Sequence, residues 1–330
     1  MKAIPIIPML IVLSFLAGCQ FAPKEKGPSS ESKEILTVDF QEGRTLRYKF
    51  VSSREMTVDW ETPEKLARSG KQTSDKSSES MEMVVAYTPI EIESHGLTTV
   101  KATCESVKVS RSKGRHRDAV ESLVGKTFEI AVGPTGKIED YSQLDELTKE
   151  IGKKAFRAGT DDARTKEPDM IGDFVATQWF LWDAVSSVEV PSRGVSPGQS
   201  WTSKLSVPTP MVMRKARDVT YRLDEIRQSE KGRLAVISSS YKQAESAPRD
   251  WPIPYSGMFQ MAGPFGFYRN YQLVNLQGQG QELFNIDAGR TEQYNQNYEI
   301  QLTASLLLPL AGVSPKITIK QNLTMKLIEN

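Results

Sequence analysis

The sequence predicts a mostly β protein of the α+β class. Two related antiparallel β-rich halves are expected, each a curved sheet or half-barrel, with two helices between or covering them. Three observations predict this fold. Many segments alternate apolar and polar residues with a period of two, two segments have helical spacing, and two short motifs recur at nearly the same offset.

The first nineteen residues are typical of a lipoprotein signal peptide, predicted over residues 1–18. Lys2 precedes an uncharged apolar stretch that is shorter than the ~20 residues a transmembrane helix needs. The stretch ends Leu16-Ala17-Gly18-Cys19, which resembles the lipobox of bacterial lipoprotein precursors. The resemblance implies that Cys19 becomes an N-terminus carrying acyl chains such as palmitate, and two or three chains give stable anchoring. The alternatives are an ordinary signal peptide that is cut elsewhere and a short N-terminal anchor.

The predicted location is the cell envelope, with the chain anchored to a membrane through its lipid. Gln20 follows the cysteine, and the absence of Asp at this position favours an outer-membrane lipoprotein that faces the periplasm. Residues 19–34 are polar and are expected to form a tether.

Composition narrows the class of protein. Removing residues 1–18 leaves 312 of the 330 residues, enough for one large or two ordinary domains. Lys and Arg number 42 and Asp and Glu number 41, so no net charge points to nucleic acid. Cys104 is then the one remaining cysteine, which rules out a disulfide within the mature chain and predicts a small buried side chain.

Alternating segments place strands in two halves, residues 35–160 and 193–330. The clearest strand is 316–327, where Ile317, Ile319 and Leu323 share one face with Met325 and Leu327. We expect it to pair with the strand that begins at Tyr298, through a turn near 312–315. The other expected strands cover residues 46–58, 81–92, 97–109, 128–132, 219–226 and 234–241.

Helical spacing predicts two helices. The first covers residues 143–158 and closes the first half, with Leu144, Leu147 and Ile151 on one face. The second covers residues 170–187, within a linking segment 161–192, and has an apolar, aromatic stripe.

An internal repeat supports the two halves. Residues 136–143 read Gly-Lys-Ile-Glu-Asp-Tyr-Ser-Gln and residues 289–296 read Gly-Arg-Thr-Glu-Gln-Tyr-Asn-Gln, while 43–50 resembles 198–205, at offsets of 153 and 155 residues. We interpret the glycines as hairpin turns at positive φ and expect each glutamate to pair with the nearby base. A binding role is the alternative for the shared positions, which are Gly136, Glu139, Tyr141, Gly289, Glu292 and Tyr294.

An aromatic insert between residues 247 and 271 is the main candidate for a site. Glycines and prolines interrupt it, so it is predicted to be either a lid over an apolar cavity or a partner surface. A long loop packed on the core is the alternative. The candidate ligand or partner residues are Trp251, Tyr255, Met258, Phe259, Met261, Phe265 and Phe267.

A basic run is the second candidate. It comprises Lys108, Arg111, Lys113, Arg115 and Arg117, and is interpreted as a solvated hairpin tip, with contact to anionic headgroups as the alternative.

The lipobox, the polar tether, the segment Gly-Arg-Thr-Leu-Arg-Tyr-Lys-Phe (43–50) and the segment Pro-Gly-Gln-Ser-Trp (197–201) resemble a family of uncharacterised bacterial lipoproteins, chiefly of planctomycete type. The resemblance covers most of the chain and implies no activity or catalytic residue. More loosely, a lipid-anchored β-rich domain with covering helices is similar to the half-barrels that carry lipids or lipoproteins across envelopes.

No motif for catalysis, nucleotide binding or metal binding appears. His95 and His116 have no second ligand at metal spacing, so no metal or cofactor is predicted, and a carboxylate-only enzyme stays open. The leading hypothesis is a non-catalytic envelope lipoprotein that binds an apolar ligand, a lipid or a segment of an exported protein. The alternative is a structural or assembly lipoprotein that acts through protein contacts and has no ligand cavity.

Overall fold

A computed structural model describes residues 33–60, 74–114, 117–156, 165–211, 213–252, 255, 260–261, 265–266, 268–306 and 315–328. These residues belong to one compact unit, Lys33–Asn330, which contains every described helix and strand. The predicted signal peptide, Cys19 and most of the tether lie outside them. In these ranges no helix combines the length and the hydropathy that crossing a membrane requires.

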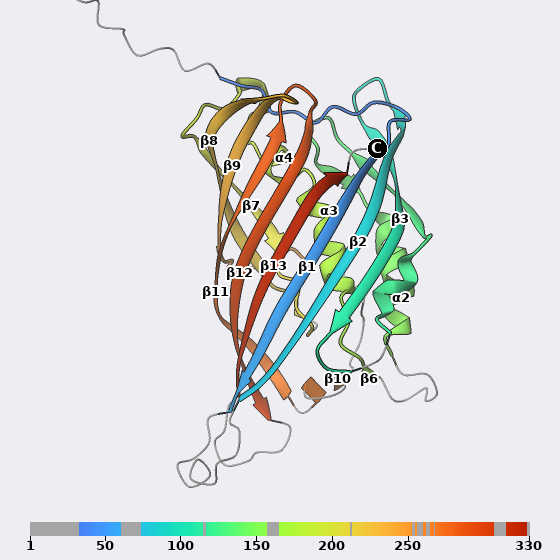
Figure 1. Ribbon diagram of the computed structural model, residues 1–330, viewed down its shortest axis with the longest axis vertical. Helices are drawn as coiled ribbons and strands as arrows, with labels where there is room; N and C mark the ends of the chain where they lie inside the picture. The colour runs from blue at the N-terminus through green and yellow to red at the C-terminus, as the bar shows by residue number, and fades with distance from the viewer. Residues whose placement is uncertain are drawn as a thin grey trace, which may run out of the picture. The chain divides into compact units, whose positions relative to one another are not determined.

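Eleven strands form one antiparallel sheet (Figure 1). Its order is β5-β4-β3-β2-β1-β13-β12-β11-β9-β8-β7, so β5 and β7 are the edges among the described strands. The strands are β1 (Leu46–Asp59), β2 (Ser74–Ile92), β3 (Thr98–Arg111), β4 (Thr127–Val132), β5 (Ile138–Asp140), β7 (Ser200–Ser206), β8 (Ala216–Ser229), β9 (Gly232–Gln243), β11 (Tyr268–Asn285), β12 (Arg290–Leu306) and β13 (Lys316–Ile328).

The strands of both predicted halves share this sheet. β1 pairs with β13 along its length, from Arg47 opposite Ile328 to Asp59 opposite Lys316. This pairing joins a meander of β1 to β5 with a second meander of β7 to β13. Mostly β content is therefore confirmed, and the internal duplication stays a prediction.

The predicted strands are present, some with longer bounds. In β13 the apolar residues are buried alternately, and the strand pairs with β12 as expected. β5, β7 and β11 are not among the strands that the alternation of apolar and polar residues predicts. β11 carries Gly278, Gly280 and several glutamines, residues of low β propensity, and its pairing with β9 and β12 overrides that propensity.

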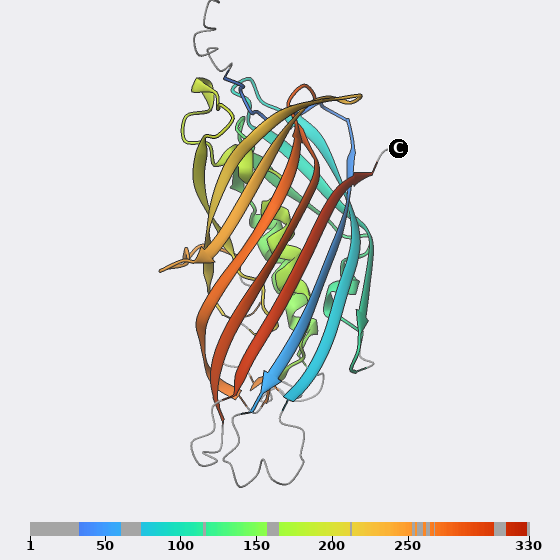
Figure 2. The same cartoon turned by 60° about the vertical axis from the view of Figure 1, so that its left-hand side comes forward.

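The helices lie on the concave face of the sheet, and Figure 2 shows the long strands curving around α3. The first predicted helix is α2 (Ser142–Lys154). The second is divided into α3 (Ile171–Phe180) and α4 (Asp183–Ser186), which is a correction to one continuous helix. Smaller elements are the 3-10 turns η1 (Ala119–Leu123) and η2 (Pro191–Arg193), and the parallel pair β6 (Thr165–Lys166) and β10 (Gln260–Met261).

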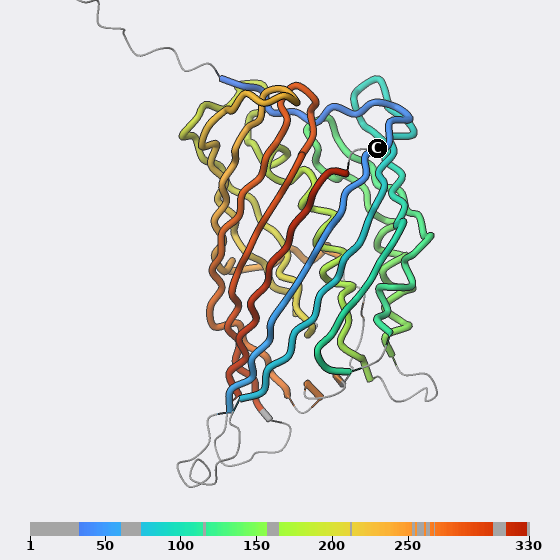
Figure 3. Tube along the Cα trace, in the orientation of Figure 1, coloured from blue at the N-terminus to red at the C-terminus, as the bar shows by residue number. Residues whose placement is uncertain are grey.

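The chain before β1 runs along the ends of the hairpins, as the tube in Figure 3 shows. Glu34 and Val195 exchange backbone hydrogen bonds, and Asp39 N donates to Gly289 O at 3.0 Å. Gly136 and Gly289 both have positive φ, in the β4–β5 and β11–β12 turns. A Cβ at Gly136 would lie 2.7 Å from Val38 Cγ2, and one at Gly289 would lie 2.4 Å from Asp39 N. Both glycines therefore supply the positive φ that the turn needs, and their lack of a side chain leaves room for the N-terminal segment to pack against the turn.

Candidate functional site

A row of polar residues interrupts the apolar concave face of the sheet. On β1, Ser52 and Arg54 occupy inward positions between Phe50 and Met56, and on β13 Gln321 lies between two buried apolar residues. Arg54 is 1% exposed. A charge at this depth requires compensating partners, because desolvation of an unpaired ion costs several kcal/mol.

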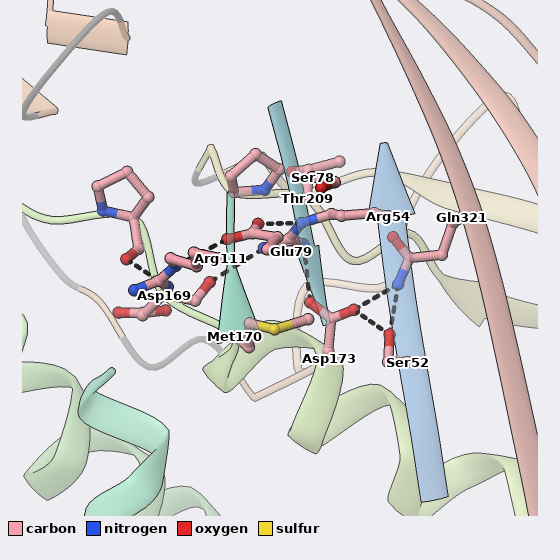
Figure 4. Close-up of polar contacts among 12 residues, drawn as sticks. Ser52, Arg54, Ser78, Glu79, Arg111, Asp169, Met170, Asp173, Thr209 and Gln321 are labelled. Atoms are coloured by element: carbon pink, nitrogen blue, oxygen red, sulfur yellow. Dashed lines mark hydrogen bonds and ion pairs between the residues drawn. The ribbon is translucent and has the colours of Figure 1, made fainter. Parts of the chain in front are cut away.

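Asp173, in the first turn of α3, supplies the main partner (Figure 4). Arg54 Nη1 donates to Asp173 Oδ2 at 2.8 Å. Ser52 Oγ and Gln321 Nε2 both donate to Asp173 Oδ1, at 2.8 and 2.5 Å. Burial alone would lower the Arg54 pKa, but Asp173 and Glu79 raise it above its ordinary value. The cluster therefore fixes α3 to the middle of the sheet in a charged, hydrogen-bonded form.

The cluster continues through Glu79 to Arg111. Arg111 Nε donates to Glu79 Oε2 at 3.0 Å, and its Nη2 bonds Asp118 and the Pro168 carbonyl. Arg111 is thus turned inward, which corrects the interpretation of the whole basic run as a solvated hairpin tip. Burial favours neutral Glu79, yet Arg54 and Arg111 hold its pKa below the usual value. Burial, helped by the charge of Asp169, raises the pKa of Asp118 to about 6.

The far end of the cluster is formed by Lys166, Asp169 and Tyr255. Lys166 Nζ lies 3.6 Å from Asp169 Oδ1 and 4.1 Å from the centre of the Tyr255 ring. The Tyr255 hydroxyl donates to Asp169 Oδ2. Burial lowers the pKa of Lys166, an effect that Asp169 partly offsets. These three side chains bring the charged cluster to the floor of a cleft.

The cleft lies between α3 and residues 204–215 and has a volume of about 100 Å³. Its walls are mainly apolar: Val175 and Trp179 come from α3, and Leu205 from the end of β7. Trp251 and Tyr255 of the predicted insert also line it. The full lining is Lys166, Asp169, Gly172, Val175, Trp179, Lys204, Leu205, Ser206, Val207, Pro208, Thr209, Met211, Met213, Arg214, Lys215, Trp251, Pro252 and Tyr255.

The insert is thus divided between the cleft and the core. Arg214 Nη1 donates to the carbonyls of Pro248 and Arg249, which fixes the chain just before Trp251. Met261 and Phe265 are buried in the hydrophobic core and do not line the cleft. Three other candidates, Met258, Phe259 and Phe267, lie outside the described residues.

One residue of the repeat motif also reaches this site. Tyr141 donates its hydroxyl hydrogen to Asp250 O at 2.6 Å, and its ring packs against Trp179 with centres 5.3 Å apart. The structure therefore brings Tyr141 together with the insert, a contact that no sequence pattern indicated.

The other repeat positions serve the turns and the core. Glu292 Oε1 lies 3.1 Å from Arg290 Nε and Glu139 Oε1 lies 3.9 Å from Lys137 Nζ, as expected. Neither pair crosses the sheet, since Arg290 and Glu292 share β12 and Lys137 directly precedes β5. Tyr294 is buried, and its hydroxyl is paired with that of Tyr241.

A second, wider hollow of about 920 Å³ crosses the strands from β3 to β11. Most of its lining points away from the helices, since Ser53, Lys320 and Gln279 alternate with inward residues on their strands. It is polar and open, without the apolar walls of the cleft.

Chemistry at the cleft is that of a binding site with a polar floor. Over the described ranges no three His, Cys, Asp or Glu side chains are placed to hold a metal ion. Cys104 is buried as predicted, and burial raises its thiol pKa to about 12, so it is not a nucleophile near neutral pH.

Comparisons with known proteins place the chain in a family. No curated protein matches it. It is similar to a solved structure of lipovitellin that describes lipid–protein interactions, with 9% identity and a TM-score of 0.42; the match covers 88% of this chain and 26% of that one. The chain thus spans about a quarter of lipovitellin. Residues 78–248, more than half of the chain, match the model of an uncharacterised family, as the sequence analysis expected, and the protein therefore belongs to the family of unknown function DUF6263.

Proposed function

We propose that this protein is a lipid-anchored lipoprotein of the cell envelope that binds an apolar group in the cleft between α3 and residues 204–215. Cys19 carries the lipid, residues 19–34 are the tether, and the protein faces the periplasm from the outer membrane. The bound group belongs to a lipid or to a hydrophobic segment of another exported protein. The two meanders of the sheet descend from one duplicated unit, a proposal that the paired motifs support.

The position of Trp251 and Tyr255 in the lining of the apolar cleft is the observation that carries the binding proposal. Tyr255 is bonded to Asp169 at the floor, and the chain before Trp251 is held by Arg214 and Tyr141. Apolar walls with a few convergent polar groups are the usual composition of a small-molecule site. The insert therefore has the contacts expected of a lid rather than of a loop lying flat on the surface.

Native mass spectrometry tests this binding. The chain from Gln20 onward contains the whole compact unit and is purified from a bacterial host without detergent. We expect a non-covalent adduct that solvent extraction removes. Trp251→Ala should reduce its occupancy several-fold, whereas Trp60→Ala, whose ring packs on Tyr268 and does not line the cleft, should not. Equal occupancy in both variants would contradict the cleft as the site.

A protein that is consistently free of adduct would favour the alternative, a structural lipoprotein that acts through protein contacts. The wide polar hollow on the outer face of the sheet is the observation that supports this second candidate. Pull-down with Lys320→Glu and Gln279→Ala variants would then identify whether partners bind there.

The anchor has a separate test. Cys19→Ala in the full-length precursor should abolish incorporation of labelled fatty acid and release the protein from the membrane fraction. Retained label would refute acylation at this residue.

A further inference from the structure

The rim of the cleft carries an excess of positive charge. Lys204, Arg214 and Lys215 line it, and among the described lining residues of the whole cleft Asp169 is the one that is acidic. Asp169 is compensated by Lys166, whose Nζ lies 3.6 Å away. The floor of the cleft is therefore close to neutral, and the charge of the site is set by its rim.

The positive charges of the three rim residues are neutralised to different extents by their neighbours. Lys204 pairs with Asp218 at 2.9 Å. Arg214 bonds two backbone carbonyls, which take up its hydrogens without cancelling its charge. Lys215 is exposed and has no ion pair among the described residues. Within the described part of the chain, no acidic side chain forms an ion pair with Arg214 or Lys215, and both lie beside the apolar cavity.

The size of the cleft limits the apolar part of its ligand. A dry apolar cavity of roughly 150 Å³ accommodates benzene. The volume here is about 100 Å³, smaller than that cavity, so the apolar part of the ligand is at most one aromatic ring or a short branched chain. A long acyl chain exceeds this space.

We propose that the ligand of this cleft is anionic, with a carboxylate or phosphate next to one compact apolar group of about the size of a benzene ring. The apolar group lies between Trp179 and Trp251, and the anionic group faces Arg214 and Lys215 at the rim. This inference rests on the proposed function, since it names the class of ligand for the same cleft.

Three probes with one apolar body and different charges test the anionic group. These are 3-phenylpropionate, 3-phenylpropionamide and 3-phenylpropylamine, titrated calorimetrically into the chain from Gln20 onward. We expect the carboxylate to bind roughly tenfold more tightly than the amide and the amine to bind most weakly, because the rim attracts negative charge. The preference should shrink at high salt, as expected for partly exposed charges.

Two matched variants distinguish the effect of the rim charges on binding from the effect of the net charge of the protein. Lys215→Glu should remove most of the preference for the carboxylate over the amide. Lys101→Glu, the same change at an exposed site on β3, should keep it. Equal affinity for the carboxylate and the amide in the unmodified protein would overturn the anionic ligand and leave apolar binding intact. No binding by any probe would instead count against the proposed function itself.

A second series tests the size limit. Hexanoate, octanoate and decanoate are compared below their micellar concentrations. If every added methylene were buried, affinity would rise about fourfold for each one. We expect affinity to level off within this series. A sustained rise to decanoate would overturn the compact group and point to a cleft that opens for lipid chains.

Discussion

Arg54 of β1 donates a hydrogen bond from Nη1 to Asp173 Oδ2 at 2.8 Å, which joins the middle of the sheet to the first turn of α3. The same guanidinium bonds Glu79 on β2 through Nε. Removing it would leave Asp173 without its cation, while Glu79 would keep its ion pair with Arg111. The fixed position of α3, and with it one wall of the cleft, depends on this contact.

Arg54→Ala should lower the free energy of unfolding by about 3–5 kcal/mol, because it leaves the buried charge of Asp173 uncompensated. Urea denaturation monitored by circular dichroism measures the change. Lys49→Ala is the matched control, since Lys49 also lies on β1 but pairs with Glu82 at the surface. The control should cost less than about 1 kcal/mol. Similar losses in both variants would contradict the role given to the buried cluster.

Glu282 should be neutral at pH 7. Thr291 Oγ1 lies 2.9 Å from Leu181 O and 2.6 Å from Glu282 Oε1. A hydroxyl has one hydrogen, so if Thr291 donates to Leu181, Glu282 must be protonated and donate to Thr291. Burial raises the pKa of Glu282 to about 8, in agreement with this arrangement.

A raised carboxyl pKa contributes stability at low pH that is lost progressively as pH rises from about 4.5 to 8. Glu282→Gln cannot ionise and should be as stable as the natural protein near pH 4. Its stability advantage over the natural protein should grow to about 4 kcal/mol by pH 8. Thermal unfolding across this pH range provides the measurement, and parallel stability curves for the two proteins would show that Glu282 is already ionised.

Arg217 is a buried cation that stacks on aromatic rings, and its charge also acts on the buried carboxyl of Asp183, whose pKa it lowers against the larger effect of burial. Its guanidinium carbon lies 4.5 Å from the centre of the Tyr241 ring and 4.6 Å from that of Tyr298, and its nitrogens have no hydrogen-bond partner among the described residues. Arg217→Met should leave the free energy of unfolding unchanged or raise it by about 1–4 kcal/mol, because an apolar side chain avoids the desolvation cost. Arg217→Lys should destabilise, since an ammonium does not stack between rings. Urea denaturation distinguishes the two, and a large loss in the Met variant would indicate that the cation is required.

Gly136→Ala should destabilise more than Gly125→Ala. Both glycines have positive φ, but a Cβ at Gly125 meets no atom within 4 Å, whereas one at Gly136 would lie 2.7 Å from Val38. Gly125→Ala should therefore cost about 1 kcal/mol from the backbone alone. Gly136→Ala should add about 1–3 kcal/mol from overpacking. Differential scanning calorimetry of the two variants checks this difference, which should vanish if residues 36–40 do not pack on the turn.

The alternation of apolar and polar residues along the sequence predicts most of the strands of the fold. The alternation in 316–327 predicted both the strand and its buried face, because one side of an antiparallel sheet packs on the core. The same criterion missed β11, whose glycines and glutamines are ordered by pairing with β9 and β12. It also could not place both meanders in one sheet, since the β1–β13 pairing joins residues at opposite ends of the chain.

The site was predicted in part. The aromatic composition of the insert indicated Trp251 and Tyr255, which line the cleft. One sequence feature does indicate the charged cluster. Arg54 and Gln321 are polar residues at inward positions of strands whose other inward residues are mainly apolar. Their partners Asp173 and Glu79 are distant in sequence, and no local pattern specifies such contacts.

The segment between the predicted anchor and the sheet touches both meanders. Val38 packs on the β4–β5 turn at Gly136, and Asp39 bonds the β11–β12 turn at Gly289. A pull directed along the N-terminal chain would load these two contacts, and the Glu34–Val195 bridge, before it reached β1. The force is then divided between the β4–β5 turn and the β11–β12 turn, which are far apart in the sequence. Under the proposed lipid anchor, a force from the membrane would therefore act on both meanders before it could separate β1 from its neighbours.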